Sequence, residues 1–182
     1  MLHDDLKSVL LTEEEIRTRV AELAAMMDSA CAAAEQPPLM IGVLKGSFMF
    51  IADLIRALKT ECAVDFMAVS SYGAKSETSG QVRILKDIGE NIEGRDVIVI
   101  EDILDSGITL RYILDLLNAR RPKSVKLCAL LDKPARRKVP VEAQFIGFSI
   151  PDEFVVGYGL DYAEKYRGLP YIGVLKPSVY ME

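Results

Sequence analysis

The spacing of apolar residues predicts three helices in this chain. Thr12 and Glu15 form a capping box, and the apolar positions that follow it recur every three or four residues. A second amphipathic stretch begins after Ser47, which we expect to be its N-cap, and a third begins near Leu110. We therefore expect helices over about 12–34, 48–58 and 110–121.

Short apolar runs alternate with these helices and predict strands. The run Val97–Ile100 is apolar at every position, which suits a central strand that is buried on both faces. Strand and helix joined by short connections are typical of a parallel sheet with crossover helices. The expected strands cover residues 39–44, 62–70, 81–88, 97–100, 125–131, 145–150, 154–156 and 171–175.

The order of these elements predicts an α/β fold with a central, mostly parallel sheet flanked by helices. Because no repeat, low-complexity tract or long linker interrupts the chain, we expect one domain over residues 1–182. Its core should span about 36–150. The two chain ends, about 1–35 and 151–182, should together form a small cap over the sheet.

Composition and charge narrow the possible functions. Half of the 182 residues are hydrophobic and 27% are charged, which supports a real core. The 22 basic and 27 acidic residues give a net charge of −5, which does not favour general nucleic-acid binding. The longest stretch without a charged residue has nine residues, far short of a membrane-spanning helix. We expect neither nucleic acid nor a membrane as a partner.

The cysteines and the N-terminus indicate a cytoplasmic protein. The first ten residues carry acids where a signal peptide would carry basic residues and then an apolar run. Cys31, Cys62 and Cys128 are odd in number and far apart among apolar residues, so we expect reduced thiols. The single histidine, His3, makes histidine-based catalysis and histidine-ligated zinc improbable.

The segment after the central strand, residues 101–109 (EDILDSGIT), is the strongest candidate for chemistry. In open α/β sheets, ligands bind beyond the carboxyl ends of the strands. Three carboxylates within five residues are costly to bury without cations, but they suit Mg²⁺ ligation and general-base chemistry. Asp105-Ser106-Gly107 before a helix can cradle a phosphate, and Thr109 adds a hydroxyl.

Simpler explanations stay open for single residues of this segment. Acids at a strand end can be solvated, and Asp and Ser can merely cap the following helix. For the whole constellation this explanation is much weaker. Gly42–Ser47 resembles a P-loop, but Lys45 precedes Gly46 instead of following it, and no GxGxxG follows a predicted strand. Lys45-Gly46 is equally an anion-binding turn or a structural one.

The run Val97–Thr109 resembles the phosphate-binding signature of the type I phosphoribosyltransferases. That signature has four apolar residues, two acids, two apolar residues, Asp, Ser or Thr, Gly, any residue and Thr, and this chain matches every position. The resemblance covers about residues 10–177. Features similar to the hypoxanthine-guanine branch are Leu44-Lys45-Gly46, Ser71-Tyr72, Asp132-Lys133, Phe154–Gly157, Asp161 and Arg167.

The resemblance implies an enzyme of purine salvage. Members of this branch transfer the 5-phosphoribosyl group from 5-phosphoribosyl diphosphate to N9 of hypoxanthine or guanine, giving IMP or GMP and diphosphate. The resemblance also implies Mg²⁺ as cofactor, small-molecule substrates, and assembly as a homodimer or homotetramer.

The resemblance also assigns roles to individual residues. Asp105 would be the base near purine N7, and a cis peptide is expected before Lys45. Ser71 and Tyr72 would lie on a lid over the reacting centre. The other roles implied are ribose and Mg²⁺ for Glu101 and Asp102; 5′-phosphate for Ser106, Gly107, Ile108 and Thr109; diphosphate for Lys45, Gly46 and Arg167; purine for Lys133, Phe154, Val155 and Asp161; and a second Mg²⁺ for Asp161.

Alternatives to these roles remain. The polar stretch 71–80 can be an ordinary loop, Phe154 can be a core residue, and the later part of the basic run 133–138 is expected to be a solvated face. A regulatory protein on the same fold would bind RNA through 133–138 and Arg120-Arg121. An enzyme acting on orotate, uracil or adenine is a further possibility, which Lys133 and Phe154 disfavour because ammonium donors match a 6-oxo group.

Overall fold

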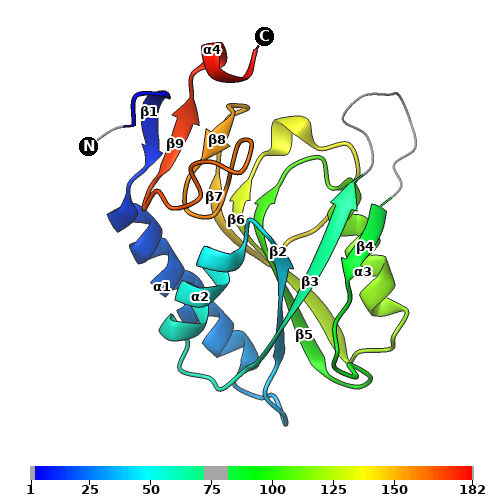
Figure 1. Ribbon diagram of the computed structural model, residues 1–182. Helices are drawn as coiled ribbons and strands as arrows, with labels where there is room; N and C mark the ends of the chain where they lie inside the picture. Colours follow the sequence, from blue (N-terminus) through cyan, green and yellow to red (C-terminus); the bar gives the residue numbers. More distant parts are fainter. Residues whose placement is uncertain (1–2, 72–81, 182) are drawn as a thin grey trace.

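The computed structural model describes residues 3–71 and 82–181, which form a six-stranded sheet with helices on both faces and a smaller sheet above it (Figure 1). The order in the large sheet is β4-β3-β2-β5-β6-β7, and all neighbouring strands run parallel except β3 and β4. Its strands are β2 (Leu39–Leu44), β3 (Ala63–Ser71), β4 (Val82–Lys86), β5 (Asp96–Leu104), β6 (Ser124–Asp132) and β7 (Phe145–Ser149).

Two layers of apolar side chains enclose the central strand β5, as its sequence predicted. Ile98 and Ile100 pack with α1 and α2 on one face, whereas Val97 and Val99 pack with α3 on the other. Side chains alternate along a strand, so a strand buried on both faces has to be apolar throughout. The helices are α1 (Glu13–Cys31), α2 (Phe48–Ala57), α3 (Ile108–Asn118) and α4 (Pro177–Tyr180), with a 3₁₀ turn at Pro134–Arg136.

The N-terminal caps of the first two helices can be compared with those that the sequence predicts, and one of them needs a correction. The Thr12 hydroxyl accepts from the backbone N–H of Glu15 at 3.2 Å, and the Glu15 carboxylate accepts from the backbone N–H of Thr12 at 2.8 Å, which confirms the capping box. Ser47 does precede α2, but its buried hydroxyl donates to the Val43 carbonyl at 2.7 Å and makes no cap. It ties the turn back onto β2 instead.

The smaller sheet joins both ends of the chain and confirms the expected cap. Its order is β1-β9-β8, all antiparallel, and Leu6 pairs with Leu175. Its strands are β1 (Leu6–Leu11), β8 (Val155–Val156) and β9 (Ile172–Leu175). Strand β1 was not expected from the sequence. The single-domain boundaries at 35/36 and 150/151 stay a prediction.

Strand β5 is longer than expected. It continues through Glu101 and Asp102 to Leu104, because β6 continues beside it as far as Asp132. The two acids therefore stand on a rigid strand and not in a loop. Among the described residues, no helix combines the length and the apolar character that a membrane crossing requires. The three cysteines are free thiols, and burial raises the pKa of Cys128 to about 12.

Candidate functional site

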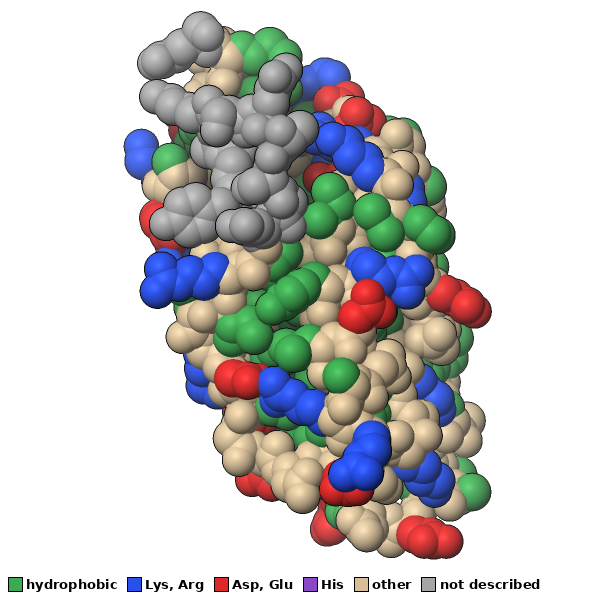
Figure 2. Space-filling view, turned by 90° about the vertical axis from the view of Figure 1, so that its right-hand side faces the viewer, with side chains coloured by type: hydrophobic (Ala, Val, Ile, Leu, Met, Phe, Trp, Pro, Cys, Tyr) green, Lys and Arg blue, Asp and Glu red, His purple; other side chains and the backbone are tan. Residues whose placement is uncertain are grey.

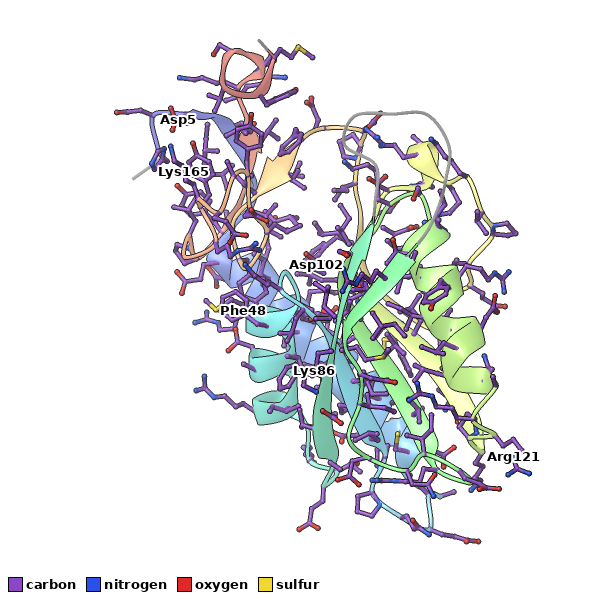
Figure 3. All side chains as sticks on the ribbon, turned by 45° about the vertical axis from the view of Figure 1, so that its right-hand side comes forward. Asp5, Phe48, Lys86, Asp102, Arg121 and Lys165 are labelled. Atoms are coloured by element: carbon purple, nitrogen blue, oxygen red, sulfur yellow. The ribbon has the colours of Figure 1, made fainter. Side chains whose placement is uncertain are left out.

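A cavity of about 260 Å³ lies beyond the carboxyl ends of β2 and β5. Its walls include both acids at the end of β5, the turn that follows them and the first residues of α3. Asp102 lies near the centre of the molecule, close to where the large sheet meets the cap (Figure 3). The candidate residues that line this cavity are Gly46, Glu101, Asp102, Asp105, Ser106, Gly107 and Thr109.

A second cavity, of about 320 Å³, adjoins the first. Asp102 and Gly46 line both cavities, and Lys45, Asp161 and Arg167 line only the second. A Cβ atom on Gly46 would lie 1.6 Å from Asp102 Oδ2, so any larger residue at this position would displace the Asp102 carboxylate. The shared wall brings together residues that the sequence separates by more than fifty positions.

The two acids on β5 are partly buried, and their charges are not fully compensated. Burial raises the pKa of both Glu101 and Asp102, and at Glu101 the neighbouring Asp102 carboxylate raises the pKa further. Asp102 Oδ1 accepts from the backbone N–H of Ile103 at 2.9 Å, but Glu101 Oε2 has no hydrogen-bond partner among the described residues. Such a pair favours a cation or a donor-rich ligand in the cavity.

The turn before α3 has the shape of an anion site. Gly107 is the N-cap of α3 and adopts φ = 84°, a left-handed conformation that favours glycine. The Ser106 hydroxyl accepts from the backbone N–H of Ile108 at 3.4 Å. Since the first backbone N–H groups of an α-helix lack partners within it, Ser106–Thr109 can receive a phosphate.

Asp105 projects from the same turn, and its side chain is 41% exposed. Arg136 Nε lies 3.2 Å from Asp105 Oδ1, as an ion pair without the alignment of a hydrogen bond. The carboxylate therefore has access to the first cavity and no hydrogen bond at Oδ1 from the described residues. A partly exposed carboxylate in this position can accept a proton from a ligand.

Two cations, each paired with an acid, line the second cavity together with Asp102. Lys45 Nζ lies 3.0 Å from Glu164 Oε1, and Arg167 Nη2 lies 2.9 Å from Asp161 Oδ1. Arg167 also donates to the Gly159 carbonyl at 2.8 Å. The peptide bond before Lys45 is cis, as expected. Within the described residues no three acidic, histidine or cysteine side chains lie close enough together to hold a metal by themselves.

The candidate purine residues lie around β8 and the end of β6. Lys133 is only 6% exposed, and its ammonium donates to the Glu153 carbonyl at 2.8 Å. Phe154 is 36% exposed and stacks on Tyr180 with ring centres 4.8 Å apart. Val155 is buried and pairs with β9. None of these three residues lines the two cavities.

Some predictions remain without a structural answer, and one holds only in part. Ser71 ends β3, and Tyr72 lies outside the described residues, so the lid stays a prediction. The later part of the basic run is not solvated throughout. The Arg137 side chain is only 20% exposed, and its Nε donates to the backbone carbonyl of Asp105. Glu164, the partner of Lys45, carried no local sequence signal.

Comparisons with known proteins agree with this geometry. The family model of the phosphoribosyl transferase domain matches residues 8–163. The hypoxanthine-guanine phosphoribosyltransferase of Bacillus subtilis is 54% identical over 180 residues, 99% of each chain. The bifunctional protein TilS/HprT of Listeria monocytogenes is 52% identical over 181 residues, all of this chain but 28% of that protein. The crystal structure of a hypoxanthine phosphoribosyltransferase from Staphylococcus aureus superimposes with a TM-score of 0.93 at 52% identity, covering 99% of this chain and 97% of that one.

We expect the substitution Glu101→Gln to stabilise the protein at neutral pH in the absence of metal and ligand. The pKa of Glu101 is higher in the folded chain than in the unfolded chain, so stability falls as pH rises through the folded-state pKa. Glutamine carries no charge, so the variant avoids the desolvation penalty of a carboxylate and should gain about 1–3 kcal/mol. Thermal denaturation between about pH 5 and pH 8 in a chelating buffer measures the difference.

The control for this prediction is Glu14→Gln, which changes a glutamate whose side chain is 83% exposed. It should leave the pH dependence of stability as in the wild type. Parallel stability curves for the wild type and Glu101→Gln would contradict the unfavourable burial of Glu101.

Proposed function

The chain belongs to the phosphoribosyltransferase family, in its hypoxanthine-guanine branch, and from this premise we propose how its site works. The enzyme transfers the 5-phosphoribosyl group from 5-phosphoribosyl diphosphate to N9 of hypoxanthine or guanine, in purine salvage. The observation that carries the proposal is the meeting of two cavities at Asp102, one with an anion-binding turn and one with two cations. A sugar with a phosphate at one end and diphosphate at the other needs such a pair of sites.

The ribosyl donor spans both cavities. The 5′-phosphate binds Ser106–Thr109 at the start of α3, where backbone N–H groups and hydroxyls converge. Glu101 and Asp102 accept hydrogen bonds from the ribose hydroxyls. The diphosphate lies in the second cavity, where Lys45 and Arg167 neutralise it and Gly46 leaves room beside the backbone.

Departure of diphosphate leaves positive charge on the ribose ring. The carboxylates of Glu101 and Asp102, fixed on β5 beside that ring, stabilise this charge as it develops. Asp105, next in line along the same wall, holds the proton of purine N7 while N9 attacks the sugar. Glu101 and Asp102 thus act on the cationic sugar, and Asp105 acts on the nucleophile.

Mg²⁺ fits the donor set of this site. Glu101 Oε2 is buried without a hydrogen-bond partner from residues 3–71 and 82–181, and Asp102 faces both cavities, so hard oxygen ligands are available between sugar and diphosphate. Glu101 and Asp102 would hold one ion next to the ribose, and Asp161 would help to hold a second near the diphosphate. When bound, the metal supplies positive charge to the leaving group. Oxygen atoms of substrate and water must complete each shell.

The purine pocket selects a 6-oxo group. Lys133 presents only donors, which match the acceptor at C6 of hypoxanthine and guanine but not the amino group of adenine. Phe154 offers a ring face for stacking, and Val155 and Asp161 border the purine. The buried position of Lys133 supports this role, because a desolvated ammonium discriminates strongly between a matching acceptor and a donor.

The alternative of an RNA-binding regulator is not favoured by the placement of the cations. Arg121 lies at the opposite end of the molecule from the 3₁₀ turn of the basic run (Figures 1 and 3). Arg120 pairs with Asp87 at 2.6 Å, and Arg121 pairs with Glu93 at 3.0 Å. On the face seen in Figure 2, basic and acidic side chains of the described residues lie interspersed. A single basic surface for a polyanion does not form from these two segments.

We further propose a cytoplasmic single-domain protein that assembles as a homodimer or homotetramer. The free thiols support a reducing compartment. Exposed apolar side chains support assembly, since Phe48, Val64 and Leu85 are 38%, 39% and 61% exposed. Sedimentation at several protein concentrations would measure the assembly.

The function is tested by initial rates with hypoxanthine, guanine, xanthine and adenine at a fixed concentration of 5-phosphoribosyl diphosphate. We expect transfer to hypoxanthine and guanine that needs Mg²⁺ and stops in excess EDTA. No transfer to any 6-oxopurine would refute the proposed reaction, and full activity in EDTA with no metal bound would refute the metal assignment.

We expect Asp105→Asn to lower the turnover of hypoxanthine by about 10²–10⁴-fold, because the variant lacks the base that takes the N7 proton. Folding and binding of Mg²⁺ with the ribosyl donor should stay near wild-type levels. Rapid-quench measurement of the chemical step gives the answer, with Asp115→Asn on the exposed side of α3 as the matched control. An unchanged chemical step would remove Asp105 from this role.

We expect Lys133→Met to depress the use of hypoxanthine and to narrow the preference over adenine, which in the wild type should be at least about 10³-fold. The physical reason is that methionine offers no donor to O6 and imposes no penalty on an amino group. The ratio of kcat/KM for the two bases measures the effect. The exposed Lys138→Met serves as control, and an unchanged ratio in Lys133→Met would overturn the assignment.

A further inference from the structure

The turn between β5 and α3 is held from outside by a single segment, residues 133–139, which we call the outer strap. The carbonyls of Leu104, Asp105 and Ser106 all accept hydrogen bonds from it. The Leu104 carbonyl receives the backbone N–H of Lys133 at 3.0 Å. The Ser106 carbonyl receives the backbone N–H groups of Lys138 and Val139 at 2.9 and 3.1 Å.

Arg137 completes this arrangement with its side chain. Its Nε donates to the Asp105 carbonyl at 3.0 Å, and its Nη2 donates to the Leu104 carbonyl at 3.3 Å. The same guanidinium bonds to the Asp132 carboxylate at the end of β6 and donates to the Val141 carbonyl at 3.3 Å. One largely buried side chain therefore joins the turn, the end of β6 and the outer strap.

These contacts bear on the anion site because carbonyl oxygens repel phosphate. Three consecutive carbonyls point toward the outer strap. The backbone N–H groups and hydroxyls of Ser106–Thr109 are therefore left to face the cavity. The strap also approaches closely: a Cβ on Gly107 would lie 2.6 Å from the Val139 carbonyl and 3.1 Å from Arg137 Cδ. The turn has few hydrogen bonds of its own, so its shape depends on the strap.

We propose that Arg137 is a positioning residue for catalysis, which sets the turn that carries Asp105 and the 5′-phosphate site by binding the carbonyls of Leu104 and Asp105. This inference rests on the proposed function of the same site. Arg137 acts through the backbone and touches neither purine nor sugar. Lys133 keeps its own backbone bond to Leu104, so purine recognition does not depend on the Arg137 side chain.

The chemistry of arginine fits this role, and lysine does not replace it. A guanidinium presents five N–H donors in a rigid plane, and here it reaches four acceptors that lie around it. A lysine ammonium in the same place keeps the charge and the aliphatic stem but offers donors from one atom only. The conservative substitution Arg137→Lys therefore separates the geometry of the turn from the charge beneath it.

The first test measures kcat, both KM values and the calorimetric affinity for ribose 5-phosphate in Arg137→Lys. We expect a folded protein in which kcat/KM for the ribosyl donor falls about 10²-fold, the scale of a misplacement of about 1 Å in a positioned group. The affinity for ribose 5-phosphate should fall as well, while the KM for hypoxanthine stays near the wild-type value. Arg17→Lys, at an exposed arginine on α1, should match the wild type in all of these.

The second test is chemical rescue of Arg137→Ala. Guanidinium chloride at low, non-denaturing concentration should restore part of the lost turnover, and sodium chloride at the same concentration should not. If Arg137→Ala does not fold, Arg137→Lys alone decides.

The proposal is overturned if Arg137→Lys retains the donor kinetics of the wild type, or if it loses only thermal stability. It is also overturned if the KM for hypoxanthine changes as much as the donor parameters. Failure of the proposed function itself would show as a wild type without transfer activity, and binding of ribose 5-phosphate would still report on Arg137 in that case.

Discussion

The placement of two adjacent, partly buried carboxylates near the end of β5 is the constraint on which the rest of the site depends. Because Ile98 and Ile100 pack on one face of this strand and Val97 and Val99 on the other, the strand cannot turn its end toward bulk water. Glu101 and Asp102 therefore stay where their charged forms are disfavoured. This arrangement lowers the stability of the ligand-free protein, but it favours the binding of a cation or a cationic sugar. Such a balance is a common reason why active sites reduce stability.

Close approaches of backbone to backbone connect the two sheets around these acids. Gly46 lies against Asp102, and a Cβ on Gly159 would lie 2.1 Å from the Gly46 carbonyl, so the turn from the large sheet packs directly on the cap. Arg167 donates to the Gly159 carbonyl from the cap side. The cap thus contributes the Arg167 guanidinium to the second cavity, and it fixes the distance between that guanidinium and β5. The segment between β8 and β9 therefore forms one wall of the second cavity.

Local patterns predicted much of this structure, and contacts between distant segments account for the differences. The capping box at Thr12, the strand at 39–44 and the signature that runs from β5 into α3 each depend on neighbouring residues, and each is present. Strand β1 escaped prediction because its partner β9 lies at the other end of the chain. Arg137 looked like part of a solvated basic run because its acceptors belong to β5, the turn after it, β6 and a later loop. Spacing along a sequence reveals which residue types are present, but not which carbonyls lie within reach.

The burial of Lys133 likewise supports the proposal that this lysine selects the purine, although its local sequence resembles that of its solvated neighbours. Among the described residues, the Lys133 ammonium makes one hydrogen bond, to the Glu153 carbonyl, while Asp152 Oδ1 stands 3.8 Å away, beyond hydrogen-bonding range. An ammonium has three donors, so a buried one with a single short bond gains from another acceptor. A 6-oxopurine brings that acceptor, whereas a 6-aminopurine brings a further donor. The proposed selectivity depends on the burial of Lys133, because an exposed ammonium would take its remaining acceptors from water and lose little with either base.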